Sequence, residues 1–307
     1  NLIDPFKTGC QGAIGALFLE ADLEITERLL SRLGARFEML SLNQETYVSP
    51  RLSMAYKTSK NSQLSVAYGG FRQQAQNKFI IYAPDLKSER AKHFIAGFQY
   101  IKESRIFRIE GYHKNYNQLI TYTSPHAIEP EAYNNKGKGY ARGLDLFFRD
   151  SKSIRNADFW ITYSLMDSKR NYRDFPKALT PGYISRHNLA FTYKQYIPQT
   201  ASYVSVGLKY ASGRPYINPN ISTEVQQRTK DYTDISLSTF HFFELFNKFT
   251  MLYLHINNVL GFDHVFGYRY GTRPNEAGTI PSEPIRPVSK RFFMLGMHIS
   301  FTGKPEM

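Results

Sequence analysis

Basic side chains recur at every second or fourth position inside apolar segments of the sequence. In "RLLSRLGARFEML" (residues 28–40), Arg32 and Arg36 alternate with Leu33, Ala35 and Phe37. On one enclosed face, such cations would focus the field and attract an acidic solute. Alternatively, they pair with carboxylates such as Glu38, Glu110 and Asp145, and we favour pairing because it is the usual state of enclosed charge. The same pattern predicts a set of inward-facing cations: Arg32, Arg36, Arg51, Lys57, Arg108, Arg149, Lys194, Lys209 and Lys290.

A second set of candidate residues, rich in Tyr and Arg, lies in segments that lack this alternation. Examples are "SKRNYRDFP", "SGRPYINP" and "FGYRYGTRP". Aromatic rings can stack on a ligand and guanidinium groups can form charge-assisted hydrogen bonds with it. The alternative is that these side chains only stiffen their loops. We expect the following residues to face a ligand: Tyr82, Tyr122, His126, Tyr133, Arg173, Arg214, Tyr216, Tyr268 and Arg269.

Signatures of enzyme chemistry are absent from the sequence. The eight His residues include no HExxH motif, and Asp263-His264 is better explained by turn composition than by metal binding. Ser185, His187 and Asn188 in "SRHN" have no acid at a defined spacing and no nucleophile elbow. There is no phosphate-binding loop. We therefore predict no catalytic residue, no metal site and no cofactor.

The elements that position these residues are strands, because apolar and polar residues alternate for about ten residues at a time. At about 3.4 Å per residue and about 40° tilt, ten residues rise roughly 26 Å, which is close to the apolar band of an outer-membrane barrel. We expect about thirteen strands, including "PRLSMAYK" (50–57), "QLSVAYGG" (63–70) and "RLLSRLGARFEML". The other ranges are 12–22, 89–101, 105–116, 138–150, 157–167, 185–195, 201–212, 231–242, 248–258 and 289–301.

The closing strand is the most apolar of these on one face. It places Phe293, Leu295, Met297, Ile299 and Phe301 on one side and Gly296, His298 and Ser300 on the other. Its apolar face needs no buried core if it contacts lipid, in which case the opposite face lines a lumen.

The connections between the expected strands alternate between short and long. Short turns fall near "KTSKNS", "KES" and "YIPQT", whereas long segments cover 73–88, 117–137, 168–184, 213–230 and 259–288. Short turns on the inner side and long loops on the outer side are typical of bacterial outer-membrane barrels. The sequence therefore predicts an all-β, transmembrane antiparallel β-barrel.

Composition agrees with this fold and excludes other classes of protein. Among 307 residues there are 22 Tyr and 23 Phe, an excess that suits the aromatic girdles of a membrane barrel. No apolar run reaches the roughly 20 residues of a spanning helix. The net charge of +13 is spread along the chain without a nucleic-acid-binding motif, so we predict no nucleic-acid partner.

An odd number of strands has a consequence for the extent of the barrel. If the short turns are periplasmic, the first strand near 12–22 starts on the outer side, whereas bacterial barrels normally enter from the periplasm and have an even number of strands. We therefore expect a fragment, with residues 1–301 forming the C-terminal portion of a barrel, residues 302–307 forming a short periplasmic tail, and earlier strands absent.

Several segments resemble the C-terminal barrel portion of TonB-dependent receptors of the kind common in Bacteroidetes. They are "SPRLSMAYKTSKNSQLSVAYGGFRQ", "NNVLGFDHVFGYRY", "RFFMLGMHISF" and the stretch from "NNKGKGYARGLDLFFRD" to "SRHNLAFTYK". The resemblance implies a 22-stranded barrel preceded by a plug domain and a TonB box, neither of which occurs in these residues. It also implies localisation in the outer membrane of a Gram-negative bacterium. A departure from the family is the tail "TGKPEM" after Phe301, because such barrels often stop at the terminal aromatic residue.

The leading hypothesis for function is an active transporter that binds its ligand at the outer loops and upper lumen. The resemblance implies energy relayed by the TonB complex, contact with outer-membrane lipid and lipopolysaccharide, and a possible surface lipoprotein partner. Inward cations would then also be able to pair with the plug, and loop Tyr and Arg would also be able to contact lipopolysaccharide. Two alternatives stay open: a structural or assembly barrel that scaffolds partner proteins, and a passive porin.

Overall fold

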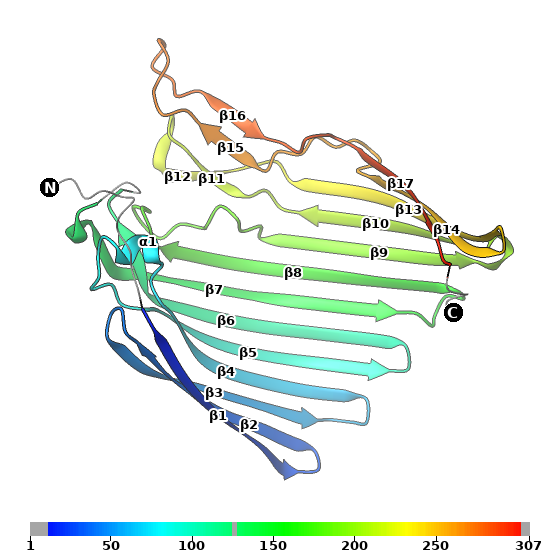
Figure 1. The fold of residues 1–307 in the computed structure, drawn as a ribbon, viewed down its shortest axis with the longest axis horizontal. Helices are drawn as coiled ribbons and strands as arrows, with labels where there is room; N and C mark the ends of the chain where they lie inside the picture. The colour runs from blue at the N-terminus through cyan, green and yellow to red at the C-terminus, as the bar shows by residue number, and fades with distance from the viewer. Residues whose placement is uncertain (1–11, 125–127, 302–307) are drawn as a thin grey trace. The chain divides into compact units, whose positions relative to one another are not determined.

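A computed structural model describes residues 12–124 and 128–301. Thirteen strands of this part of the chain form one sheet, in the order β1-β2-β3-β4-β5-β6-β7-β8-β9-β10-β13-β14-β17 (Figure 1). The remaining strands form two hairpins, β11–β12 and β15–β16. The predicted all-β class and the predicted number of sheet strands are both confirmed. Among the residues described, no helix is long and apolar enough to cross a membrane.

Each sheet strand corresponds to one of the thirteen predicted segments. The bounds are β1 Ile14–Thr26, β2 Leu29–Leu40, β3 Glu45–Lys57, β4 Ser62–Gln73, β5 Glu89–Lys102, β6 Arg105–Tyr122, β7 Tyr133–Asp150, β8 Ala157–Asn171, β9 His187–Ile197, β10 Ser202–Ala211, β13 Tyr232–Leu245, β14 Lys248–Asn257 and β17 Phe292–Ile299. Three central strands, β6, β7 and β8, extend beyond the predicted ranges at the ends that join the long connections.

The chain divides into two compact units. Unit 1 comprises Asn1–Gln99, Glu110–Leu144 and Met166–Pro181, and unit 2 comprises Tyr100–Ile109, Asp145–Leu165 and Gly182–Met307. The strands β5 to β8 each contribute residues to both units.

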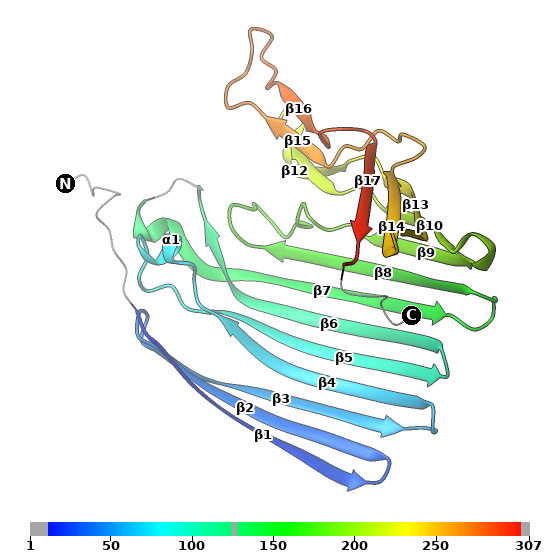
Figure 2. The same cartoon turned by 45° about the vertical axis from the view of Figure 1, so that its right-hand side comes forward.

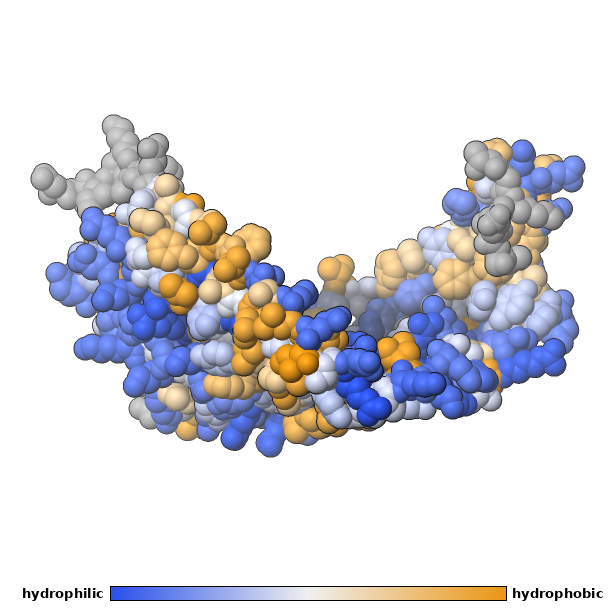
Figure 3. Space-filling view, turned by 90° about the horizontal axis from the view of Figure 1, so that it is seen from below, coloured by the Kyte–Doolittle hydropathy of each residue, from blue (hydrophilic) through white to orange (hydrophobic). Residues whose placement is uncertain are grey.

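In unit 1 the pairing of strands places apolar residues opposite one another. Leu33 of β2 pairs with Leu52 of β3, and Leu52 pairs in turn with Tyr68 of β4. Because paired residues share a face of the sheet, this row continues as one apolar face. The face is open rather than covered, since Leu17 and Leu19 of β1 are 71% and 77% exposed. Figure 3 shows hydrophobic residues gathered over these first strands.

Unit 2 repeats the same arrangement at the end of the sheet. Leu295 of β17 pairs with Leu254 of β14, and Met297 pairs with Leu252, while Gly296 pairs with Tyr253 on the opposite face. The predicted division of the closing strand is therefore confirmed. Leu295 is 72% exposed, as expected for a side chain that contacts lipid.

Lys290 is the exception among the predicted strand cations. It precedes β17 instead of lying within it, and its Nζ lies 3.3 Å from Oδ1 of Asp263 in the connection after β14. The pKa of Asp263 is lowered by this contact. The prediction that Lys290 faces a lumen from a strand is wrong, because Pro287 and the residues around it leave the ladder before β17 begins.

The long connections contain structure that the sequence pattern did not predict. A short helix, α1 (Asn77–Ile80), lies between β4 and β5. In unit 2 the hairpins β11 (Pro215–Asn218) with β12 (Ser222–Arg228) and β15 (Gly267–Tyr270) with β16 (Ser282–Ile285) extend from the ends of the sheet strands (Figure 2). These strands are short, and Pro284 interrupts β16, so their alternation is too brief to detect.

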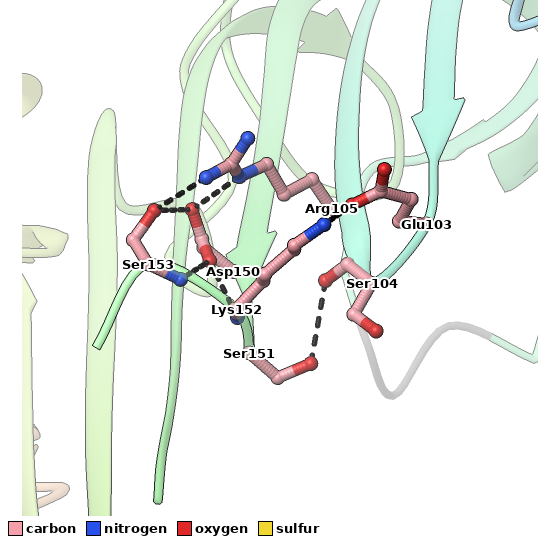
Figure 4. Close-up of polar contacts among 7 residues, drawn as sticks. All are labelled: Glu103, Ser104, Arg105, Asp150, Ser151, Lys152 and Ser153. Atoms are coloured by element: carbon pink, nitrogen blue, oxygen red, sulfur yellow. Dashed lines mark hydrogen bonds and ion pairs between the residues drawn. The ribbon is translucent and has the colours of Figure 1, made fainter. Parts of the chain in front are cut away.

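Two neighbouring short turns of unit 2 are joined by polar contacts (Figure 4). Asp150, at the end of β7, accepts hydrogen bonds from Nε of Arg105, the backbone N–H of Lys152, and both the N–H and the hydroxyl of Ser153. Its side chain is only 6% exposed. Lys152 also pairs with Glu103 of the adjacent turn, but both of those side chains are about half exposed. Asp150 is therefore the contact that fixes these turns.

Replacing Asp150 by Ala is expected to destabilise the fold more than replacing Lys152 by Gln. The first change removes the buried carboxylate that accepts all four of these hydrogen bonds, whereas the second removes only an exposed ion pair. We expect Asp150→Ala to lower the urea midpoint, measured by heat-modifiable gel migration in detergent micelles, by roughly three times as much as Lys152→Gln. Equal shifts would contradict the assignment.

Candidate ligand-binding site

The residues expected to face a ligand fall into two groups, one in each unit. Tyr82, Tyr122, Tyr133 and Arg173 belong to unit 1, whereas Arg214, Tyr216, Tyr268 and Arg269 belong to unit 2. His126 lies outside the described residues.

The unit 1 tyrosines form part of a small core around α1. Tyr133 is 8% exposed and packs with Ile80, Leu86 and Ile120. Its ring stacks on Tyr82 at 6.5 Å between centroids, and Tyr122 lies 5.8 Å away. These rings are held by each other, so the cluster stiffens the connection between β4 and β5.

Arg173 of unit 1 is anchored by its backbone rather than by its side chain. Its N–H donates to the carbonyl of Ile120 at 2.7 Å, and its carbonyl accepts from the N–H of Tyr122 at 2.9 Å. The guanidinium is exposed and lies 5.0 Å from the ring centroid of Tyr172. The adjoining cavity measures only about 60 Å³, which leaves room for little more than water.

Unit 2 contains a larger cavity of about 310 Å³ at the ends of its strands. Three cations line it: Lys209 from β10, Arg214 from the following connection, and Lys230 before β13. The remaining lining combines aromatic rings, hydroxyl and amide groups and aliphatic side chains: Tyr210, Tyr232, Phe266, Thr162, Ser164, Ser185, Ser212, Thr229, Asn188, Leu189, Ala190, Ala211 and Val265. This mixture of positive charge, aromatic surface and hydroxyl groups suits an anionic ligand with planar groups.

The carboxylate of Asp231, beside this cavity, is already hydrogen-bonded within the protein. Asp231 accepts a hydrogen bond from the hydroxyl of Tyr210 at 2.7 Å and from the N–H of Gly213 at 2.8 Å. These bonds lower the pKa of Asp231, with the Tyr210 hydroxyl contributing most. Because Asp231 stays ionised and engaged, it orients Tyr210 and the start of the connection.

The connection that carries Arg214 requires a glycine. The backbone N–H of Arg214 donates to Oγ1 of Thr229, and Thr229 N–H donates back to the carbonyl of Arg214, each at 2.9 Å. Gly213 is buried here, and a Cβ at that position would clash with the carbonyl oxygen of Thr229. Only glycine therefore allows the two backbones to approach closely enough to place Arg214 on the cavity.

The other unit 2 candidates join the two hairpins to each other. The rings of Tyr216 and Tyr268 lie 4.7 Å apart, and Tyr216 donates its hydroxyl to Gln227. Asn220 and Ile280 exchange two hydrogen bonds, of 2.9 and 2.8 Å. Arg269 pairs in register with Glu283 across β15–β16. These contacts support the loop layer, and neither Tyr216, Tyr268 nor Arg269 lines the 310 Å³ cavity.

Some of the predicted inward cations pair with carboxylates, which is the kind of contact that the favoured interpretation predicts. Arg32 binds Asp22 through two hydrogen bonds of 2.6 and 2.9 Å, Arg36 binds Glu38 at 3.0 Å, and Arg149 binds Asp158 through two bonds of 3.0 and 2.7 Å. Arg51 lies 5.4 Å from the ring centroid of Phe71, and Arg108 is exposed on β6. Lys209 differs from these residues because it lines the cavity.

Sequence reasoning missed several lining residues, including Lys230 and Tyr232. "SRHN" did supply a signal, since Ser185 and Asn188 both line the cavity. His187 contacts the Tyr163 hydroxyl at 2.8 Å through Nδ1. The His187 ring therefore contacts a tyrosine hydroxyl, and not a serine that could act as a nucleophile. Among the described residues no cluster of three or more His, Cys, Asp and Glu side chains could hold a metal ion.

Substituting Gly213 by Ala is expected to loosen the cavity wall locally. The added methyl group must displace the Thr229 carbonyl, so the backbone bonds between residues 214 and 229 weaken. Hydrogen exchange measured by mass spectrometry should become at least about tenfold faster in peptides covering 212–215 and 228–231.

The matched control is Gly267→Ala in β15, because a Cβ there meets only Ile285 at an ordinary 3.7 Å. The control should leave exchange at 212–215 unchanged. The assignment is refuted if Gly213→Ala behaves like this control.

A model of the family described as "TonB dependent receptor-like, beta-barrel" matches residues 6–259. No curated protein matches the sequence.

Solved structures share the fold. They include the ferric-catecholate import receptor Fiu from Escherichia coli K12 (TM-score 0.69, 12% identity, covering 93% of this chain and 44% of that one). The FrpB iron transporter from Neisseria meningitidis has a TM-score of 0.70 at 10% identity, covering 93% and 44%. The siderophore receptor PiuA from Acinetobacter baumannii has a TM-score of 0.70 at 12% identity, covering 94% and 43%. The chain thus spans less than half of each of these proteins.

Proposed function

Because the chain belongs to the TonB-dependent receptor family, whose β-barrels are transporters in the outer membrane of Gram-negative bacteria, we propose that it forms the ligand-binding barrel portion of an active importer. The chain is accordingly not an enzyme. Uptake driven by the TonB complex is part of the same proposal.

The observation that carries the proposal is the composition of the unit 2 cavity. Lys209, Arg214 and Lys230 bring three positive charges to one opening, and no ion pair joins any of them to another described residue at 4 Å or less. The rings of Tyr210 and Tyr232 lie beside them. Cations that have no carboxylate within ion-pair distance and lie next to aromatic rings can bind anions that carry planar groups.

An anionic ferric chelate is the ligand that this cavity supports best. Among proteins of the same fold, one is named as a ferric-catecholate import receptor and another as a ferripyoverdine receptor bound to ferripyoverdine. A ferric tris-catecholate carries negative charge on planar rings, so it matches both the cations and the tyrosines of the cavity. A cavity of about 310 Å³ would hold part of such a chelate.

The other expected partners follow from the same proposal. We propose that the TonB complex supplies energy, that outer-membrane lipid surrounds the apolar face, and that a surface lipoprotein associates with the loop layer of β11–β12 and β15–β16. The engagement of Tyr216 with Tyr268 favours a preformed loop surface, which lowers the ordering cost of binding.

Reversing the charge of Arg214 in the complete receptor is expected to weaken binding of a ferric tris-catecholate complex. Placing a carboxylate on the cavity opposes the anion, so the Kd should rise about tenfold or more. Tryptophan fluorescence quenching in detergent micelles would measure it. Arg186→Glu is the matched control, because Arg186 is an exposed neighbour that does not line the cavity. Equal changes in the two variants would refute the site.

The transport part of the proposal is tested in cells. Uptake of iron-55 presented as the same complex should be abolished in a strain that lacks TonB. Uptake that is unaffected by loss of TonB would instead indicate a passive porin, and binding without uptake would favour a scaffold.

A further inference from the structure

A second surface of unit 1, unrelated to the charged cavity, has the character of a binding site. It is a groove of about 510 Å³ that crosses four strands. Its walls are Leu52 of β3, Val66 and Tyr68 of β4, and Phe94 of β5, with Gly111 and His113 of β6 at its far side. The rings of Tyr68 and Phe94 lie 4.9 Å apart and form one wall.

The groove lies on the apolar face of the sheet. Leu52 pairs with Leu33 on one side and with Tyr68 on the other, and Met54 pairs with Val66. Residues in register share a face, so the groove continues the exposed row that includes Leu33. In an outer-membrane barrel this exposed apolar face contacts lipid.

A glycine extends the groove across β6. A Cβ built on Gly111 meets nothing within 4 Å, so a side chain at this position would project into open space. On a lipid-facing surface such a gap between larger side chains must be filled by lipid, because no water competes for an apolar depression in hydrocarbon.

One end of the groove is polar. Lys92 lies two residues before Phe94 on β5 and therefore on the same face of that strand, and His113 lies two residues after Gly111 on β6. Because β5 and β6 are antiparallel neighbours, Lys92 and His113 lie at the same end of the groove. This is the end where the connection of residues 74–88 enters β5. Lys92 is exposed and forms no ion pair of 4 Å or less with another described residue.

We propose that this groove is a specific site for an anionic membrane lipid, with one acyl chain lying between Phe94 and Val66 over Gly111 and the phosphate of the headgroup binding Lys92. The apolar walls match an acyl chain, and the cation at the loop end matches a phosphate placed where the hydrocarbon stops. The site does not depend on the imported ligand, since the groove contains no residue of the charged cavity.

Lipid binding to the complete receptor tests the proposal. The protein is delipidated in dodecyl maltoside and given dioleoyl phosphatidylglycerol or dioleoyl phosphatidylcholine, and native mass spectrometry measures the retained lipid. Wild type should retain more of the anionic lipid. Lys92→Gln should reduce this preference about fivefold, whereas Gly111→Leu should reduce retention of both lipids by filling the groove.

Two control variants separate the groove from general effects on the surface. Gly15→Leu fills another open glycine position, one that pairs with Met39 on the apolar face of β1, and Lys60→Gln removes an exposed lysine from the turn between β3 and β4. Both should behave like wild type. Heat-modifiable gel migration confirms that each variant is folded.

Several results would overturn the proposal. They are equal retention of the two lipids by wild type, a Gly111→Leu variant that matches Gly15→Leu, and a Lys92→Gln variant that matches Lys60→Gln. Displacement of the anionic lipid by millimolar inorganic phosphate would show that the site recognises free phosphate and not a lipid.

Discussion

Backbone hydrogen bonding inside a hydrocarbon layer is the constraint on which the rest of this structure depends. Unpaired N–H and C=O groups there cost several kcal/mol each, so a chain that crosses with strands must pair every strand with its neighbours. The thirteen-stranded sheet meets this requirement for every strand between β1 and β17, by joining strands that are mostly sequential through alternating short and long connections. Period-two alternation then follows, because each residue of a paired strand faces either lipid or the interior.

This alternation also decides where binding can occur. The lipid face has apolar rows such as Leu33, Leu52 and Tyr68, whereas the opposite face carries Arg32 and Arg36 with their carboxylate partners. These pairs neutralise part of the charge on that face. The proposed ligand site therefore lies at strand ends, where connections bring additional cations such as Arg214 and Lys230 beside Lys209. A single glycine at position 213 permits that arrangement.

Sequence and structure agree where the physics is local and differ where it is not. The closing strand could be assigned to its faces from alternation alone, because the division of Leu295 and Gly296 depends only on the pleat. The sequence predicted that Arg149 would pair with a carboxylate. It could not identify Asp158 as that carboxylate, because the choice depends on strand register, which no single segment encodes. The charged cavity combines segments from residue 162 to residue 266, so only the folded sheet brings them together. Tyr133 shows a different limit of the sequence. It was predicted to face a ligand because it lies in a loop, but in the structure it is buried in a small core.

The central claim is that alternate residues of one strand contact lipid and the aqueous interior. Spin labels placed singly at positions 204 to 209 of β10 in the complete receptor, reconstituted in phospholipid vesicles, measure this directly through collision with oxygen and with a nickel chelate. Oxygen accessibility should be high at 204, 206 and 208, the face on which Val206 lies opposite Tyr193 and Leu237. Accessibility to the nickel chelate should be higher at 205, 207 and 209 than at those positions. Accessibilities that vary smoothly along the strand, without a period of two, would contradict the account.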